Sequence, residues 1–274
     1  MAHFEPASYP NFADKHNERA AHSPADFVAY LRSTGGLSGY EAPAGVILCY
    51  QRSLYNHMLL SEGLTRPERR DALHGVVLLP STDGRVGVLG QFGIGAPAAA
   101  VVLEELAAAG THSFISIGTA GSLQHDLQIG DLVLCGAAIR DEGVSHHYLP
   151  PGKFANPAPA ITATFKMALK QAGAPVRTGV SWTIDTPYRE TVAEIARYQS
   201  EGVLCVEMEA AALFAVAQVR GLQIAAGFAV SDRLAGLIWD PQFHSPQVAD
   251  SLVVLYEAAL TTLLAAAPRQ GRAG

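Results

Sequence analysis

Short apolar runs alternate along the chain with segments whose apolar residues are spaced as on one face of a helix, and one stretch shows this pattern clearly. Val203–Val206 is an apolar run typical of a buried strand. Apolar residues then recur at helical spacing between Leu213 and Ala217, and Gly221 is placed to end that helix. Leu222–Val230 is a second apolar run. This stretch therefore predicts a strand, a helix and a second strand.

Acidic residues lie where these two predicted strands end. Glu207 and Glu209 follow the first strand, and Ser231 and Asp232 follow the second. In open α/β sheets the carboxyl ends of the strands bind ligands, so these carboxylates are candidate site residues. Each acid also has a structural interpretation: glutamates in a first helical turn are stabilised by the helix dipole by about 0.3–1 kcal/mol, and an Asp after a strand often caps the next helix.

The same alternation continues along the rest of the chain. Further strands are predicted at Val46–Tyr50, Val76–Leu79, Arg85–Gly90, Ser113–Ile117, Leu132–Ile139 and Gly179–Ile184. Helices are predicted at Ala25–Ser33, Arg52–Leu60, Ala98–Ala109, Pro157–Ala172 and Ser245–Ala266. Strands that alternate with helices favour an α/β fold: a single three-layer α/β/α domain with a mixed, largely parallel central sheet. We expect residues 45–268 to form this domain, residues 1–44 to be an N-terminal extension packed on it, and residues 269–274 to be a frayed tail.

Composition narrows the classes of partner and compartment. The chain has 274 residues, 49% of them hydrophobic, and its net charge of −6 argues against binding to nucleic acid or to an anionic membrane surface. No signal-peptide pattern begins the chain, and no apolar run reaches the roughly 20 residues of a membrane span. Cys49, Cys135 and Cys205 each lie in an apolar strand-like run and predict buried thiols of a reducing compartment. We therefore expect a cytoplasmic protein.

Two local motifs have more than one interpretation. Gly93-Ile94-Gly95 precedes a helix and fits the dinucleotide pattern G-x-G-x-x-A, but the next strand, Ser113–Ile117, ends without the acid that binds a ribose. We favour a glycine turn that brings backbone amides close to a ligand. His146 and His147 are expected to point to opposite faces of a strand, which argues against a shared metal. No metal site is predicted.

Five ordered segments from about residue 46 onward resemble the nucleoside phosphorylase family, which contains uridine phosphorylase, hexameric purine nucleoside phosphorylase and the methylthioadenosine nucleosidases. The segments are Gly93–Gly95, Ile117–Gly121, Gly130–Asp131, Arg140–Ser145 and Val206–Ala210. The resemblance implies cleavage of the bond between a ribose and a base, with no organic cofactor and with inorganic phosphate as co-substrate.

The resemblance also implies roles for the acidic residues. The carboxylate of Glu209 would accept hydrogen bonds from the 2′- and 3′-hydroxyls, Met208 would pack under the ribose, and Glu207 lies beside them. Asp232 would protonate or hydrogen-bond the leaving base, as in the purine-specific members. Tyr188, in a loop that lacks the uracil-reading Gln and Arg in their usual form, is a candidate to stack on the base. These signals favour a purine.

Family phosphorylases lend a histidine near the N-terminus to the ribose 5′-hydroxyl of a neighbouring subunit. His22 is our candidate for this role, with His3 as the second choice. The resemblance therefore implies a homo-oligomer, either a dimer or a trimer of dimers.

The phosphate site departs from the family pattern. The Gly-Asp-Pro-x-Arg turn is absent after the first strand, and Ser116 stands where the phosphorylases have an arginine. Gly93, Thr119 and Arg52 remain as phosphate-binding candidates. Arg140 or one of the arginines at positions 66, 69 and 70 could substitute for the missing cations. We favour phosphorolysis, because the flanking segments resemble uridine phosphorylase. Hydrolysis by water and a non-catalytic nucleoside-binding protein are the alternatives.

Overall fold

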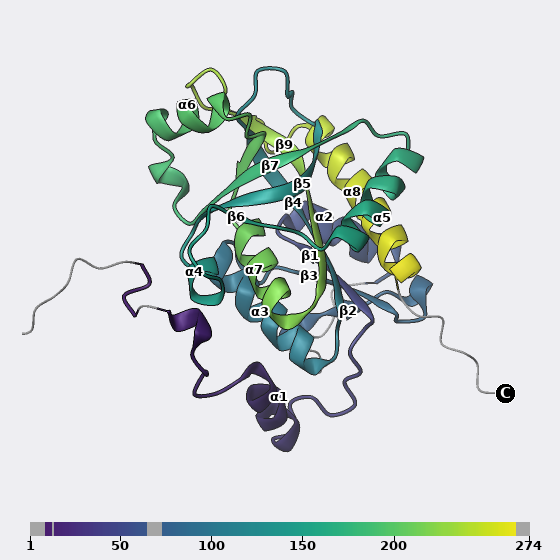
Figure 1. The fold of residues 1–274 in the computed structure, drawn as a ribbon. Coiled ribbons are helices and arrows are strands. Elements are labelled where there is room, and N and C mark those ends of the chain that lie inside the picture. Colours follow the sequence, from purple (N-terminus) through teal and green to yellow (C-terminus); the bar gives the residue numbers. More distant parts are fainter. Residues whose placement is uncertain (1–8, 13, 65–72, 267–274) are drawn as a thin grey trace, which may run out of the picture.

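The computed structural model describes residues 9–12, 14–64 and 73–266, and its helices and strands alternate along the chain (Figure 1). The strands are β1 (Gly45–Cys49), β2 (Val77–Leu78), β3 (Val86–Gly90), β4 (Ser113–Ser122), β5 (Leu132–Asp141), β6 (Phe154–Ala155), β7 (Val176–Ile184), β8 (Cys205–Glu207), β9 (Gln223–Arg233) and β10 (Asp240–Pro241). The α-helices are α1 (Pro24–Ser33), α2 (Arg52–Ser61), α3 (Ala96–Ala109), α4 (Ser145–Tyr148), α5 (Pro159–Gln171), α6 (Val192–Ser200), α7 (Ala210–Arg220) and α8 (Pro246–Ala266).

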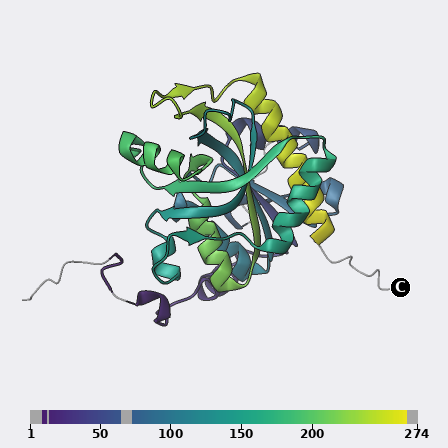
Figure 2. The same ribbon diagram turned by 45° about the horizontal axis from the view of Figure 1, so that its top comes forward.

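Helices cover both faces of the sheet, which confirms the predicted three-layer α/β/α class. In β1, Val46 and Leu48 pack into a core shared with α3 and α7, whereas Ile47 and Cys49 pack into a second core shared with α2, α5 and α8. Side chains alternate across a strand, so a strand covered on both faces is apolar at every position. Figure 2 shows α5 and the yellow α8 together on one side of the sheet.

Strand β4 is the centre of the sheet. It pairs in parallel with β9 along its length and with β1 over Ser113–Ile117, and its last two residues pair with β8 instead. The order β9-β5-β7-β8-β4 then returns to β9, so this part of the sheet closes on itself. The partner of β4 therefore changes from β1 to β8 between Ile117 and Gly121, where the candidate ligand-binding turns lie.

Several elements differ from the sequence prediction. The glycine-rich segment after Ile117 continues β4, and Ser231 and Asp232 lie inside β9, because these two strands pair as far as Ser122 and Arg233. Helix α6 was not predicted; of its residues only Ile195 is buried, so it carries little apolar signal. His146 and His147 lie on the short helix α4, so their placement on a strand was wrong.

Helix α8 is long and apolar enough, by length and composition alone, to pass as a membrane span, which the sequence analysis did not expect. Its buried side chains Val248, Leu252, Leu255, Ala259 and Leu263 belong to the core beneath the sheet. We therefore interpret α8 as a core helix.

Residues 9–12 and 14–44 lie on the face of the sheet that α3 and α7 cover. Helix α1 begins with a capping box, in which Ser23 and Asp26 exchange hydrogen bonds, and it packs on α3. Upstream of it, the hydroxyl of Tyr9 lies 3.1 Å from Nε2 of His147 on α4. His3 and residues 269–274 lie outside the described part of the chain.

Candidate functional site

The turn between β8 and α7 is held together by the carboxylate of Glu207. Its Oε2 accepts hydrogen bonds from the backbone N–H groups of Glu209 (2.8 Å) and Ala210 (2.7 Å). Its Oε1 accepts from the hydroxyls of Ser181 and Thr183 on β7. Glu207 is buried, and burial raises its pKa. Four protein donors, two from the turn and two from β7, therefore satisfy this carboxylate.

Glu209 lies at the N-cap position of α7 and is 8% exposed. Its Oε1 accepts a hydrogen bond of 2.6 Å from the backbone N–H of Gly95. Burial, and then the neighbouring charge of Glu207, raise the pKa of Glu209 to about 8. The side chain of Glu209 thus accepts one hydrogen bond from the described residues, whereas that of Glu207 accepts four. Glu209 therefore has more acceptor capacity left for the hydroxyl groups of a ligand.

The glycine turn before α3 brings its second glycine to Glu209. Gly93 and Gly95 have φ values of +109° and +89°, where side chains other than hydrogen are strained. A Cβ on Gly95 would lie 3.8 Å from Cε of Met208. The turn therefore places Gly95, Met208 and Glu209 together, while the predicted contact of Gly93 with phosphate stays a prediction.

Asp232 lies near the end of β9 and is 7% exposed. Its Oδ1 accepts from the hydroxyl of Ser231 at 2.7 Å, and its Oδ2 accepts from Nε1 of Trp239 at 2.9 Å. Burial raises its pKa. Burial, and then the charge of Asp232, also raise the pKa of Glu190 to about 7. The charge of Asp232 therefore affects a second carboxyl group, Glu190, to which the sequence assigned no role.

Gly121 of β4 lies between β8, which precedes Glu209, and β9, which contains Asp232. It pairs with Val206 of β8 on one side and with Asp232 of β9 on the other. Strands are spaced by about 4.8 Å, so Val206 and Asp232 lie about 10 Å apart. Glu209 follows Val206 by three residues, so the segments that carry Glu209 and Asp232 lie on either side of the last residues of β4.

Neutral side chains fill the region after β1. The hydroxyl of Tyr50 lies 3.1 Å from Oγ of Ser116, and Nε2 of Gln51 donates to Oγ1 of Thr119 at 3.0 Å. Burial, and then the charge of Glu209, raise the pKa of Tyr50 well above its usual value. Arg52 begins α2 and is exposed. The Tyr50 hydroxyl therefore contacts the serine that replaces the arginine of the family pattern.

Arg140 is already engaged elsewhere. Its guanidinium donates to the hydroxyl and carbonyl of Ser145 and to the carbonyls of Leu149 and Pro150, at 2.7–3.2 Å. These bonds tie β5 to the segment around α4, and the use of Arg140 as a substitute phosphate clamp stays a prediction. The arginines at positions 66, 69 and 70 lie outside the described residues.

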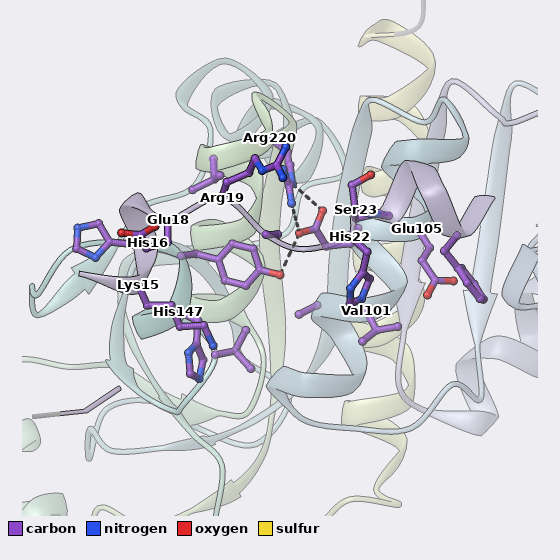
Figure 3. Close-up of a pocket in the computed structure, with 18 of the residues that line it drawn as sticks. Lys15, His16, Glu18, Arg19, His22, Ser23, Val101, Glu105, His147 and Arg220 are labelled. Atoms are coloured by element: carbon purple, nitrogen blue, oxygen red, sulfur yellow. Dashed lines mark hydrogen bonds and ion pairs between the residues drawn. The ribbon is translucent and has the colours of Figure 1, made fainter. Parts of the chain in front are cut away.

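His22 and Tyr188 are the remaining predicted residues. His22 lines a cavity of about 930 Å³ between residues 15–24 and helices α3, α4 and α7 (Figure 3). Within this lining, Arg220 of α7 donates a hydrogen bond to Glu104 of α3. Neither Glu209 nor Asp232 lines this cavity. Tyr188 is fully exposed, and its stacking on a base stays a prediction.

The site contains residues that sequence reasoning missed. Gly95 belongs to a motif that was recognised, but the backbone amide was expected to face a ligand rather than Glu209. Ser181 and Thr183 are two residues apart on β7 and so share one face of the strand, a signal that could have suggested a common partner. Nothing in the sequence pattern pointed to Trp239. Among the described residues, no group of three or more His, Cys, Asp or Glu side chains is arranged to hold a metal ion.

Comparison with known proteins gives a consistent result. The family profile described as "Phosphorylase superfamily" matches residues 55–261. Guanosine phosphorylase of Halorubrum lacusprofundi is 32% identical over 146 residues, and uridine phosphorylase of Salmonella typhimurium is 31% identical over 155 residues. These matches cover 53% and 52% of this chain, and they span only 61% of the length of each relative.

A solved structure has a similar fold. It is purine nucleoside phosphorylase from Toxoplasma gondii in complex with immucillin-H, which superposes with a TM-score of 0.70. The match covers 82% of this chain and 92% of that chain, at 20% sequence identity. At this identity the likeness shows the fold alone.

Proposed function

Because the chain belongs to the phosphorylase superfamily, we propose that it cleaves the N-glycosidic bond of a nucleoside by phosphorolysis, releasing a free base and ribose 1-phosphate. The observation that supports this proposal is the placement of Glu209, just after β8, and Asp232, in β9, on the two sides of β4 at Gly121. Inorganic phosphate is the co-substrate in this proposal, and no organic cofactor takes part.

In this proposal Glu209 binds the sugar and Asp232 acts on the base. The carboxyl oxygens of Glu209 accept hydrogen bonds from the 2′- and 3′-hydroxyls, and Met208 packs under the ribose. Glu207 acts through Glu209, because its own oxygens hold the turn. A phosphate oxygen bonds to C1′ as the C1′–N bond breaks, and the electron pair of that bond leaves with the base. Asp232 delivers a proton or a hydrogen bond to the base, an effect worth roughly 10²–10⁴ in rate.

The nature of the base follows from the same residues. The carboxyl groups of Asp232 and Glu190 accept hydrogen bonds or, when protonated, supply a proton, and a purine offers nitrogen atoms that can take part. We therefore keep a purine nucleoside as the preferred substrate. The relatives include both guanosine and uridine phosphorylases. A test of the substrate must therefore include purine and pyrimidine nucleosides.

Hydrolysis is the second candidate because of one observation. Tyr50 and Ser116 form a neutral contact where the family pattern places a cation, and Gln51 bonds to Thr119 beside it. An anion is held best by charged donors. If no arginine compensates, water would replace phosphate as the nucleophile.

The quaternary structure and compartment are also proposals. We infer a cytoplasmic homo-oligomer, a dimer or a trimer of dimers, in which His22 of a neighbouring subunit approaches the ribose 5′-hydroxyl. The buried free thiols Cys49, Cys135 and Cys205 fit a reducing compartment. The net charge of −6 gives no support for a nucleic-acid or membrane partner.

Release of free base from adenosine, inosine, guanosine, uridine and methylthioadenosine, with and without phosphate, tests the proposal. We expect release that depends on phosphate and yields ribose 1-phosphate, and we expect Glu209→Ala to abolish it. Asp232→Asn is expected to slow purine substrates most. Equal release without phosphate would establish hydrolysis instead. Nucleoside binding without any release would favour the non-catalytic binding protein.

A further inference from the structure

The loop between β9 and β10, residues 234–239, brings an indole group to the candidate acid. Nε1–H of Trp239 donates to Oδ2 of Asp232 at 2.9 Å, while Oδ1 accepts from Ser231. Both oxygens of this buried carboxylate therefore have a protein donor. A ligand that hydrogen-bonds to Asp232 must share an oxygen with one of these donors or displace that donor. Trp239 lies on a loop and Ser231 lies in a strand, and loops move more readily than strands.

The two ends of this loop are anchored, which confines any movement to its tip. On one side Asp240 pairs with Arg233 across the β9–β10 ladder and forms an ion pair with it at 2.6 Å. On the other side Nε2 of Gln199, from α6, donates to the carbonyl of Ala235 at 3.1 Å. The short segment 236–239 is held by the bond of Trp239, by a turn at Leu237 and by a ring contact of Trp239 with Phe243 at 6.2 Å between centroids.

The tip presents apolar side chains outward. Leu237, Ile238 and Trp239 are 45%, 79% and 59% exposed. Leu237 also has a φ of +57°, a left-handed conformation that costs a residue other than glycine about 1–2 kcal/mol. An indole with one bonded polar atom and a largely exposed ring has an apolar surface available for a flat apolar partner such as a nucleobase.

We propose that Trp239 is a positioning residue for the nucleobase: its N–H holds Asp232 before the base binds, and a ring nitrogen of the entering base, which takes the proton of Asp232, replaces the indole N–H at that oxygen while the indole packs against the base. This inference rests on the proposed function, in which Asp232 meets the base. It restricts the substrate to bases with a ring nitrogen that can take a proton from Asp232. Once the proton has moved, the new ring N–H donates to Asp232, so the carboxylate again has two donors.

The bond from Trp239 also acts on the protonation of Asp232. A donor to a carboxylate favours its ionised form, and so it opposes the burial that raises the pKa of this group. In Trp239→Phe the ring remains but the donor is lost, so the pKa of Asp232 rises further. Because the proposed acid must be protonated, the alkaline limb of kcat/KM is expected to move to higher pH, by about one unit.

The first test is fluorescence, because the chain has only two tryptophans. Trp182 is wholly buried and donates to Asp141, away from Asp232. In Trp182→Phe, which leaves Trp239 as the reporter, titration with adenine, hypoxanthine, guanine and uracil is expected to change the emission with at least one base. In Trp239→Phe that change is expected to vanish. Unchanged emission in Trp182→Phe, at base concentrations that inhibit cleavage, would overturn the inference.

The second test is the pH profile of kcat/KM. Ile238→Ala is the matched control, because it alters the same tip and keeps the indole N–H. We expect the alkaline limb to shift in Trp239→Phe and to stay in place in Ile238→Ala. If the wild type cleaves nucleosides and neither profile moves, the role of Trp239 is wrong and the proposed function stands. If the wild type cleaves no nucleoside, the proposed function fails, and the role of Trp239 fails with it.

Discussion

Two glutamates two residues apart in the chain have different environments. Glu207 receives four hydrogen bonds, two of them from Ser181 and Thr183 on β7. Glu209 receives one, from the backbone of Gly95, which is 114 residues away in the sequence. The sequence placed both acids at the end of a strand. It could not decide which one would be satisfied internally, because the donors come from distant elements.

The raised pKa of Glu209 makes the stability of the ligand-free protein depend on pH. Its folded-state pKa of about 8 lies above the ordinary value of 4.5, so the fold favours the protonated form. The stability from this group is complete below about pH 4.5 and is lost as the pH rises through about 8. Glutamine cannot ionise, so Glu209→Gln is expected to raise Tm relative to wild type more at pH 9 than at pH 5.

Thermal unfolding followed by circular dichroism at the two pH values provides this measurement. Glu257→Gln, on the exposed side of α8, is the control and should show the same difference from wild type at both pH values. A Tm difference for Glu209→Gln that does not grow with pH would contradict the assignment of a buried carboxyl group with a raised pKa.

At the scale of elements, the site depends on how closely β8 and β9 approach β4. Gly121 allows this approach because it has no side chain. A Cβ at this position would lie 2.9 Å from Oδ2 of Asp232, 3.1 Å from Leu234 and 3.3 Å from Val206. The same glycine was recognised in the sequence as part of a ligand-binding turn. Its observed role is to make room for the carboxylate on the next strand.

Gly121→Ala is therefore expected to displace Asp232 and to lower kcat/KM for purine nucleosides at least tenfold, because a misplaced acid loses much of the roughly 10²–10⁴ that general-acid catalysis supplies. Gly136→Ala, on β5, is the matched control, since its Cβ would meet nothing closer than 3.4 Å. Steady-state kinetics of both variants check this expectation. Equal activities would show that Asp232 does not depend on the space at Gly121.

At the scale of the whole molecule, the face that carries α1, α3 and α7 has exposed apolar side chains around the cavity lined by His22. Phe27, Val101 and Val219 are 41%, 52% and 48% exposed, and all three line that cavity. Exposed apolar side chains gathered in one place often mark a protein interface. This face is therefore a reasonable site for the proposed contact between subunits.

We expect light scattering to give the mass of a dimer or a larger oligomer. Val101→Lys, which adds a charge to this face, is expected to lower that mass. Met167→Lys, at a similarly exposed position on α5 across the sheet, is expected to leave it unchanged. A wild-type mass of a single chain would contradict the prediction, and equal masses for the two variants would move the interface elsewhere.

The sequence by itself determined most of the helices and strands, because hydrophobic periodicity is local. It also placed Glu209 and Asp232 beside strand ends, where the structure has them. Where an element has no local periodicity of its own, the sequence did not predict it or its full length. Helix α6 has one buried side chain and so left no pattern, and β4 and β9 extend beyond their apolar runs because they pair with each other.

Only the tertiary structure decided which polar groups meet. The contacts of Gly95 with Glu209, of Tyr50 with Ser116 and of Thr183 with Glu207 join residues from separate elements. Even Trp239 and Asp232, seven residues apart, meet because the chain reverses between β9 and β10. A hydrogen bond requires two groups within about 3 Å, and sequence spacing does not specify that distance once the chain has folded back on itself.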